Sequence, residues 1–198
     1  MANSNAFIGF QPYSPGGGAA TTNFVLRETR ILYSNGTKIY KNDPVQMLSS
    51  GYIGQWTSGT AASQLAGIFW GCEYPNAVGG GVSWSPYWPG SGAAPTNAVV
   101  KAYIIPVDLA SPMWFVAQSD STAFTQGDVG ATVDVTIGTG STSTGLSGAS
   151  LAYASLATTN TQPFKIMGLF NGIGNGSDAS SSYNAVYVAA NMTSSTGI

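Results

Sequence analysis

The chain of 198 residues contains no histidine, a single cysteine (Cys72), and only six basic and eight acidic side chains. Charged residues make up 7% of the chain, against about 25% in an average globular protein. Without an imidazole, the chain cannot form a serine or cysteine nucleophile paired with histidine, or a histidine metal site. One cysteine cannot form an intrachain disulfide. We therefore expect a structural or binding protein that is not an enzyme and needs no metal or cofactor.

The shortage of charge also limits the partners. Six Lys and Arg residues do not supply the basic surface that displaces counterions from a nucleic acid, so we expect no nucleic-acid partner. The chain has no apolar run of about 18 residues, and its N-terminus lacks the basic and apolar regions of a secretory signal, so we expect no membrane partner.

Hydrophobic residues make up 43% of the chain and aromatic residues 12%, which is enough for a sizeable core. Short runs rich in β-branched and aromatic residues, separated by Gly, Pro, Asn and Ser, predict an all-β fold. Asn35-Gly36 between two such runs predicts a hairpin. The architecture is either an antiparallel β-barrel or a jelly-roll-like β-sandwich, because strand order cannot be read from strand pattern. The expected strands are 24–33, 38–40, 45–48, 52–56, 65–74, 99–107, 113–118, 129–137, 164–170 and 183–188.

Two segments depart from this pattern. Residues 1–23 predict an extended N-terminal arm, because prolines and the Gly16–Gly18 run interrupt any regular element. The arm is either a frayed terminus or a segment that docks on a neighbour through its apolar residues Phe7, Ile8, Phe10 and Tyr13. Residues 24–198 then form a single β domain.

The second segment is a long irregular loop at 75–97, which contains Trp84, Tyr87 and Trp88. These aromatic side chains can cap the core, bind a partner chain or stack on sugar rings.

Other candidate chemistry is weaker. Cys72 lies in an apolar strand and is expected to behave as a small hydrophobic residue. Asp128 and Asp134 are six residues apart on one predicted strand, or about 20 Å, which is too far for a glycosidase pair. The glycines at 172, 174 and 176 lack the lysine and the helix of a phosphate-binding loop and are read as a turn.

Several segments together resemble the head decoration, or cement, proteins of tailed bacteriophages. They are residues 35–51, Gly-Ile-Phe-Trp-Gly-Cys-Glu-Tyr at 67–74, Ser-Pro-Tyr-Trp-Pro at 85–89, and residues 127–130, 138–148 and 164–170. The resemblance implies an all-β protein, made in the cytoplasm of the host bacterium, that binds the outer capsid surface of the virion. It also implies a homotrimer that joins neighbouring subunits of the major capsid protein.

Three hypotheses of function follow. The first is a capsid decoration protein that clamps the shell through the arm and the aromatic loop. The second is a carbohydrate-binding or host-recognition module of a virion, with Trp84, Tyr87 and Trp88 as a sugar platform. The third, and weakest, is a glycoside hydrolase or lyase that uses carboxylates alone.

Overall fold

The computed structural model describes residues 2–6, 8–13, 25–107 and 113–191, and in this part of the chain the fold is built from β-strands. The first sheet, sheet A, has the order β1-β10-β14-β13-β11-β12. Its strands are β1 (Gln11–Tyr13), β10 (Trp114–Gln118), β11 (Thr132–Thr136), β12 (Ser150–Ala157), β13 (Phe164–Leu169) and β14 (Ala185–Ala190).

Sheet B has the order β2-β9-β6-β4-β5, and β7 pairs with the outer part of β6. Its strands are β2 (Arg27–Ile31), β4 (Pro44–Met47), β5 (Ile53–Gln55), β6 (Leu65–Pro75), β7 (Val82–Ser85) and β9 (Val100–Pro106). The short strands β3 (Ile39–Tyr40) and β8 (Tyr87–Trp88) pair with each other. The pairing between the named strands is antiparallel, which confirms the predicted all-β class.

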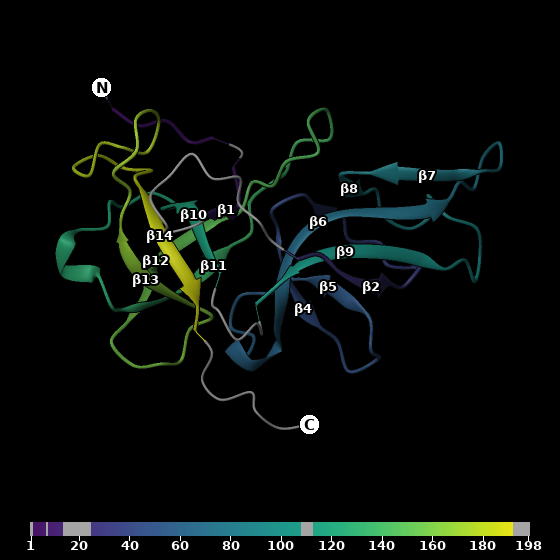
Figure 1. Cartoon of the computed structure of the whole chain (residues 1–198), viewed down its shortest axis with the longest axis horizontal. Helices are drawn as coiled ribbons and strands as arrows, with labels where there is room; N and C mark the ends of the chain where they lie inside the picture. The colour runs from purple at the N-terminus through teal and green to yellow at the C-terminus, as the bar shows by residue number, and fades with distance from the viewer. Residues whose placement is uncertain (1, 7, 14–24, 108–112, 192–198) are drawn as a thin grey trace.

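The two sheets form two lobes that lie side by side (Figure 1). Sheet B and the β3–β8 pair enclose one apolar core, in which Phe69 and Trp88 are completely buried. Sheet A covers a second core around Phe115 and Phe164. Ile68 from β6 also belongs to this second core, so the lobes share buried apolar contacts. Neither sheet closes into a barrel in the described part of the chain.

The described N-terminal residues pack on their own chain. The sequence leaves two alternatives open, a frayed terminus and an arm that docks on a neighbour. β1 adds an edge strand to β10, and Phe10 is completely buried with its ring 4.5 Å from that of Phe164. The ring of Tyr13 lies 4.4 Å from that of Tyr187 in a tilted arrangement. Phe7 and residues 14–24, with the Gly16–Gly18 run, lie outside the described residues. Residues Gln11–Tyr13 of the predicted arm are therefore an edge strand of sheet A.

Two further expectations about local structure are wrong. The Asn35-Gly36 turn does not make a hairpin, because β2 pairs with β9 and β3 pairs with β8. Its Asn35 carbonyl instead accepts a hydrogen bond from the indole N–H of Trp88 at 2.9 Å. Residues 75–97 are not wholly irregular, since they contain β7 and β8. In both cases a distant strand supplies the partner that the local pattern did not reveal.

Segment 129–137, in which apolar and polar residues alternate, contains β11, and two residues of its polar side, Thr132 and Asp134, are buried. Asp134 is buried and accepts hydrogen bonds from the indole N–H of Trp56 (2.9 Å) and the hydroxyl of Ser58 (2.7 Å). The backbone N–H groups of Gly59 and Val135 also donate to it at 2.8 Å. A carboxylate held by this many donors is stable inside the fold because its charge is satisfied.

Candidate interaction surfaces and a buried polar junction

The three aromatic residues predicted in loop 75–97 have different surroundings. Trp84, on β7, is 59% exposed. Trp88 is completely buried in the core of sheet B and meets the ring of Tyr74 edge-on at 5.4 Å. Tyr87 is half-buried and stacks on Tyr40 at 5.4 Å. The three side chains therefore cannot form one sugar platform, which corrects that expectation: Trp84 is the exposed member.

Trp84 instead belongs to a polar surface on the outer side of β7, β6, β9 and β2, which we call the outer face. The register places Glu73 beside both Trp84 and Lys101, and Glu28 beside Tyr103. These five residues define the outer face. Sequence reasoning did not find Glu73, Lys101, Tyr103 or Glu28 as a group, because the two contacts between them join residues that are 30 and 73 positions apart in the chain.

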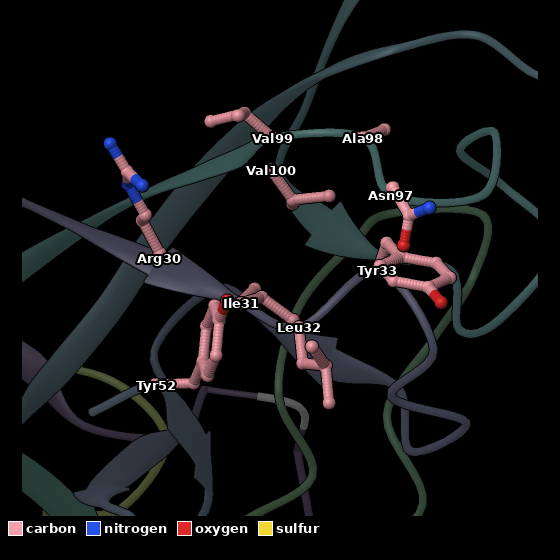
Figure 2. A pocket seen from close by; sticks show the side chains of 9 residues that line it. All are labelled: Arg30, Ile31, Leu32, Tyr33, Tyr52, Asn97, Ala98, Val99 and Val100. Carbon is pink, nitrogen blue, oxygen red and sulfur yellow. The ribbon is translucent and has the colours of Figure 1, made fainter. Parts of the chain in front are cut away.

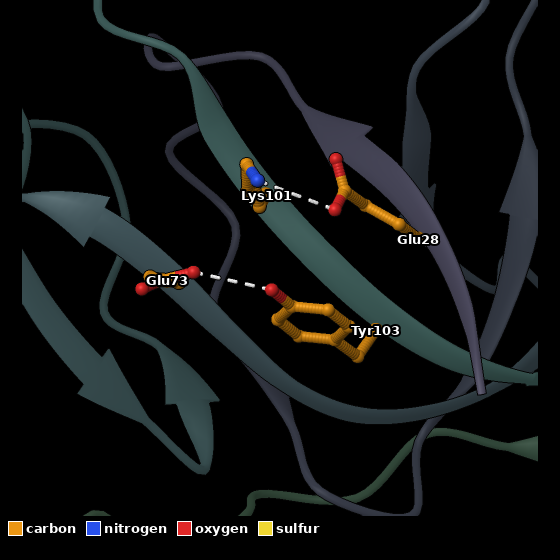
Figure 3. Close-up of polar contacts among 4 residues, drawn as sticks. All are labelled: Glu28, Glu73, Lys101 and Tyr103. Atoms are coloured by element: carbon orange, nitrogen blue, oxygen red, sulfur yellow. Dashed lines mark hydrogen bonds and ion pairs between the residues drawn. The ribbon is translucent and has the colours of Figure 1, made fainter.

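Two polar contacts order the outer face (Figure 3). The Lys101 ammonium pairs with the Glu28 carboxylate at 3.3 Å, and the Tyr103 hydroxyl donates a hydrogen bond to Glu73 at 3.1 Å. The bond to Glu28 raises the pKa of Lys101, and the bond to Glu73 raises the pKa of Tyr103. Both groups therefore keep their protons, and the face stays a fixed set of donors and acceptors near neutral pH.

A second surface lies where the two edges of sheet B, β2 and β5, approach each other without pairing. Here a cavity of about 270 Å³ opens between Tyr33 and Asn97 on one side and Tyr52 on the other (Figure 2). Leu32 and Val99 line the cavity and are 37% and 52% exposed.

We call Leu32 and Val99, together with the cavity, the seam surface. Leu48, whose N–H bonds to the Tyr52 carbonyl at 2.9 Å, lines a different hollow, and both Leu48 and its neighbour Met47 are exposed. Exposed apolar side chains gathered around a hollow are typical of a protein-binding site.

A buried polar junction at Asn42 and Asp43 ties three separate parts of the chain together. Asn42 donates from its side chain to the Ile8 carbonyl at 2.9 Å, and its own carbonyl accepts from the Phe10 N–H at 3.0 Å. Its N–H bonds to the Phe69 carbonyl at 2.7 Å. The junction therefore links the N-terminal segment to sheet B. Ile8, predicted as a partner-binding residue, is half-buried here.

Asp43 extends the junction to the loop at 138–148. Its carboxylate accepts hydrogen bonds from the Tyr40 N–H (2.8 Å), the Gln55 amide (2.9 Å) and the Ser147 hydroxyl. The side chain is 1% exposed, and burial raises its pKa to about 6, although the three hydrogen bonds lower it. Since burial is the larger effect, the ionised carboxylate is stabilised less in the fold than in water.

The structure also places the groups considered for catalysis. Asp134 is buried, and Asp128 closes a capping box on the 3₁₀ turn η2 (Gln126–Asp128). Cys72 is buried, and burial raises the pKa of its thiol to about 12. No group of three or more Asp, Glu, Cys or His side chains that could hold a metal occurs among the described residues.

No family model, no curated protein and no solved structure matches this chain. Within the ranges that the structure describes, no helix is long and apolar enough to cross a membrane.

Proposed function

We propose that the chain is a non-enzymatic structural protein of a tailed-phage virion. It binds the outer surface of the capsid as a homotrimer, bridges subunits of the major capsid protein and stabilises the shell. It is made in the cytoplasm of the host bacterium. The major capsid protein is proposed as the partner because residues 35–51, 67–74 and the other segments resemble decoration proteins.

The observation that supports a protein partner most directly is the seam surface. Apart from Ile173, the large apolar side chains that are exposed in the described residues belong to residues 25–99, which carry the strands of sheet B other than β9. Leu32 and Val99 lie beside a cavity that can receive an apolar side chain of a partner. Burying them on the capsid gains about 25 cal/mol for each Å² of apolar surface, with few charges to desolvate.

Co-sedimentation with empty shells of the major capsid protein encoded in the same genome tests this proposal. We expect the wild-type chain to bind the shells at saturating stoichiometry. The double variant Leu32→Ser and Val99→Ser should bind at least tenfold more weakly, since anchors in well-packed interface pockets contribute about 2 kcal/mol or more.

The matched control is Ile173→Ser, because Ile173 is fully exposed on the sheet A half. Its binding should equal that of the wild type. Absence of binding by the folded wild-type chain would refute the proposed function, and equal losses in the double variant and the control would refute the role of the seam surface.

A further inference from the structure

Trp84 is held in place by the fold although most of its side chain faces solvent. Its strand β7 pairs with β6, where Trp84 is opposite Glu73. The indole of Trp84 extends across Gly71, which lies on β6 two residues before Glu73. A Cβ atom at Gly71 would lie 2.9 Å from Cζ2 of Trp84. Gly71 therefore leaves the room that the indole occupies. A large aromatic surface that is exposed and already ordered loses little conformational freedom when a ligand stacks on it.

Polar groups with hydrogen-bonding capacity lie next to this indole. Glu73 accepts one hydrogen bond from Tyr103. Because a carboxylate has about four acceptor positions, Glu73 can accept further hydrogen bonds from a ligand. Lys101, opposite Glu73 in the register, carries three N–H donors, one of which meets Glu28. The outer face thus offers acceptors and donors within one or two strand spacings of Trp84, about 5–10 Å.

This combination fits a sugar better than a protein or a charged ligand. Glu28 and Glu73 are balanced by Lys101 and the neighbouring Arg30, so the face has no net charge to attract an ion. A protein partner would have to bury the ion pair between Glu28 and Lys101, and that desolvation is costly. Sugar hydroxyls can replace the water molecules at these groups, while the C–H side of a pyranose ring packs on the indole.

We propose that the outer face binds a neutral glycan, with one pyranose ring stacked on Trp84 and its hydroxyl groups hydrogen-bonded to Glu73 and Lys101. Tyr103 is a positioning residue, because its hydroxyl orients the Glu73 carboxylate. The outer face adjoins the seam surface, because Arg30 lines the seam cavity and Val99 lies two residues before Lys101, so glycan binding is measured on the free chain. It differs from the sugar platform of the second hypothesis, since Trp84 is joined by Glu73 and Lys101 instead of Tyr87 and Trp88.

An array of neutral oligosaccharides tests the proposal, with glucose, mannose, galactose and N-acetylglucosamine oligomers in α and β linkages. Sialylated and uronic-acid oligomers form the charged arm. Hits are then titrated by calorimetry and by quenching of tryptophan fluorescence. We expect binding to at least one neutral series, an at least tenfold loss in Trp84→Ala, and a smaller loss in Trp84→Phe, which keeps a stacking ring. Glu73→Gln should weaken binding as well.

The control variant is Val82→Ala, which changes an exposed side chain on the same strand as Trp84. It should bind like the wild type, and thermal unfolding should show that every variant is folded. The proposal is overturned if no neutral glycan binds, if only charged glycans bind, or if Trp84→Ala binds as well as the wild type. A concentration-dependent dimer that Trp84→Ala abolishes would assign the face to a second copy of the chain instead.

Discussion

Replacing Asp43 by asparagine should remove a pH dependence that the buried junction gives to the folded chain. The pKa of Asp43 is about 6 in the fold and 3.8 for an ordinary aspartate. The folded chain therefore binds this proton more tightly than the unfolded chain does. By linkage, the contribution of Asp43 to the free energy of unfolding is greatest below pH about 4 and is lost as pH rises through about 6.

The size of this effect follows from the two pKa values. A shift of about two units at about 1.4 kcal/mol each corresponds to about 3 kcal/mol between low and neutral pH. Asparagine keeps an acceptor for the Tyr40 N–H and the Gln55 amide, and it presents its own NH₂ to the Ser147 hydroxyl, which can accept. Asp43→Asn should therefore fold, with a stability that changes less with pH.

Urea unfolding followed by tryptophan fluorescence at pH 4 to 8 measures the effect. We expect the free energy of unfolding of the wild type, relative to that of Asp43→Asn, to fall by about 2 kcal/mol over this range, because part of the effect is already lost at pH 4. Asp178→Asn is the control. Hydrogen bonds from the Ser180 and Ser181 hydroxyls lower the pKa of Asp178 to about 2, so its contribution is lost only below pH about 4. If the free energy of unfolding changed equally with pH in the wild type and in Asp43→Asn, the reasoning would be refuted.

Three further predictions concern the interior. Gly9→Ala should destabilise the chain by about 2–4 kcal/mol in urea unfolding, because Gly9 has a φ of +55° and a Cβ there would lie 2.6 Å from the Asn42 carbonyl oxygen. Gly51→Ala, at a φ of +79° with open space around it, should destabilise the chain by about 1 kcal/mol. If Gly9→Ala and Gly51→Ala lost the same stability, crowding against Asn42 would not be the cause. Cys72 should react with a thiol reagent at pH 8 only as the chain unfolds, since burial raises its pKa to about 12; rapid labelling of the folded chain would show that the thiol is accessible. Trp56→Phe should cost about 2–4 kcal/mol, because it removes a donor to the buried Asp134 carboxylate, whereas a loss below about 1 kcal/mol would mean that water replaces the indole.

The sequence pattern predicted the strands that have strong local signals. β6, rich in apolar and aromatic residues, and the β4–β5 hairpin around Gly51 are both confirmed. Glycine inside a strand indicates a bulge or a close backbone approach, and within β6 the register with β9 shifts between Phe69 and Gly71 while the backbone of Ile105 lies close to Gly67. In these places the local sequence determines the local structure.

Features that depend on distant partners could not be predicted in this way. β12 was missed because its alanine and serine residues have weak strand propensity, and pairing with β11 makes it a strand. Asp134 lies on the polar side of an alternating strand, but Trp56 and Ser58, which follow β5, donate hydrogen bonds to its buried carboxylate. The outer face is likewise created by register, which brings Trp84, Glu73 and Lys101 together.

The most direct test of the proposed function is to locate the chain in purified virions of the phage whose genome encodes it. Mass spectrometry would measure the number of copies relative to the major capsid protein, and gold-labelled antibodies would show where the chain lies on intact particles. The proposal predicts a fixed ratio to the capsid protein and labelling over the outer surface of the head. Absence of the chain from virions, or labelling confined to the tail, would contradict it.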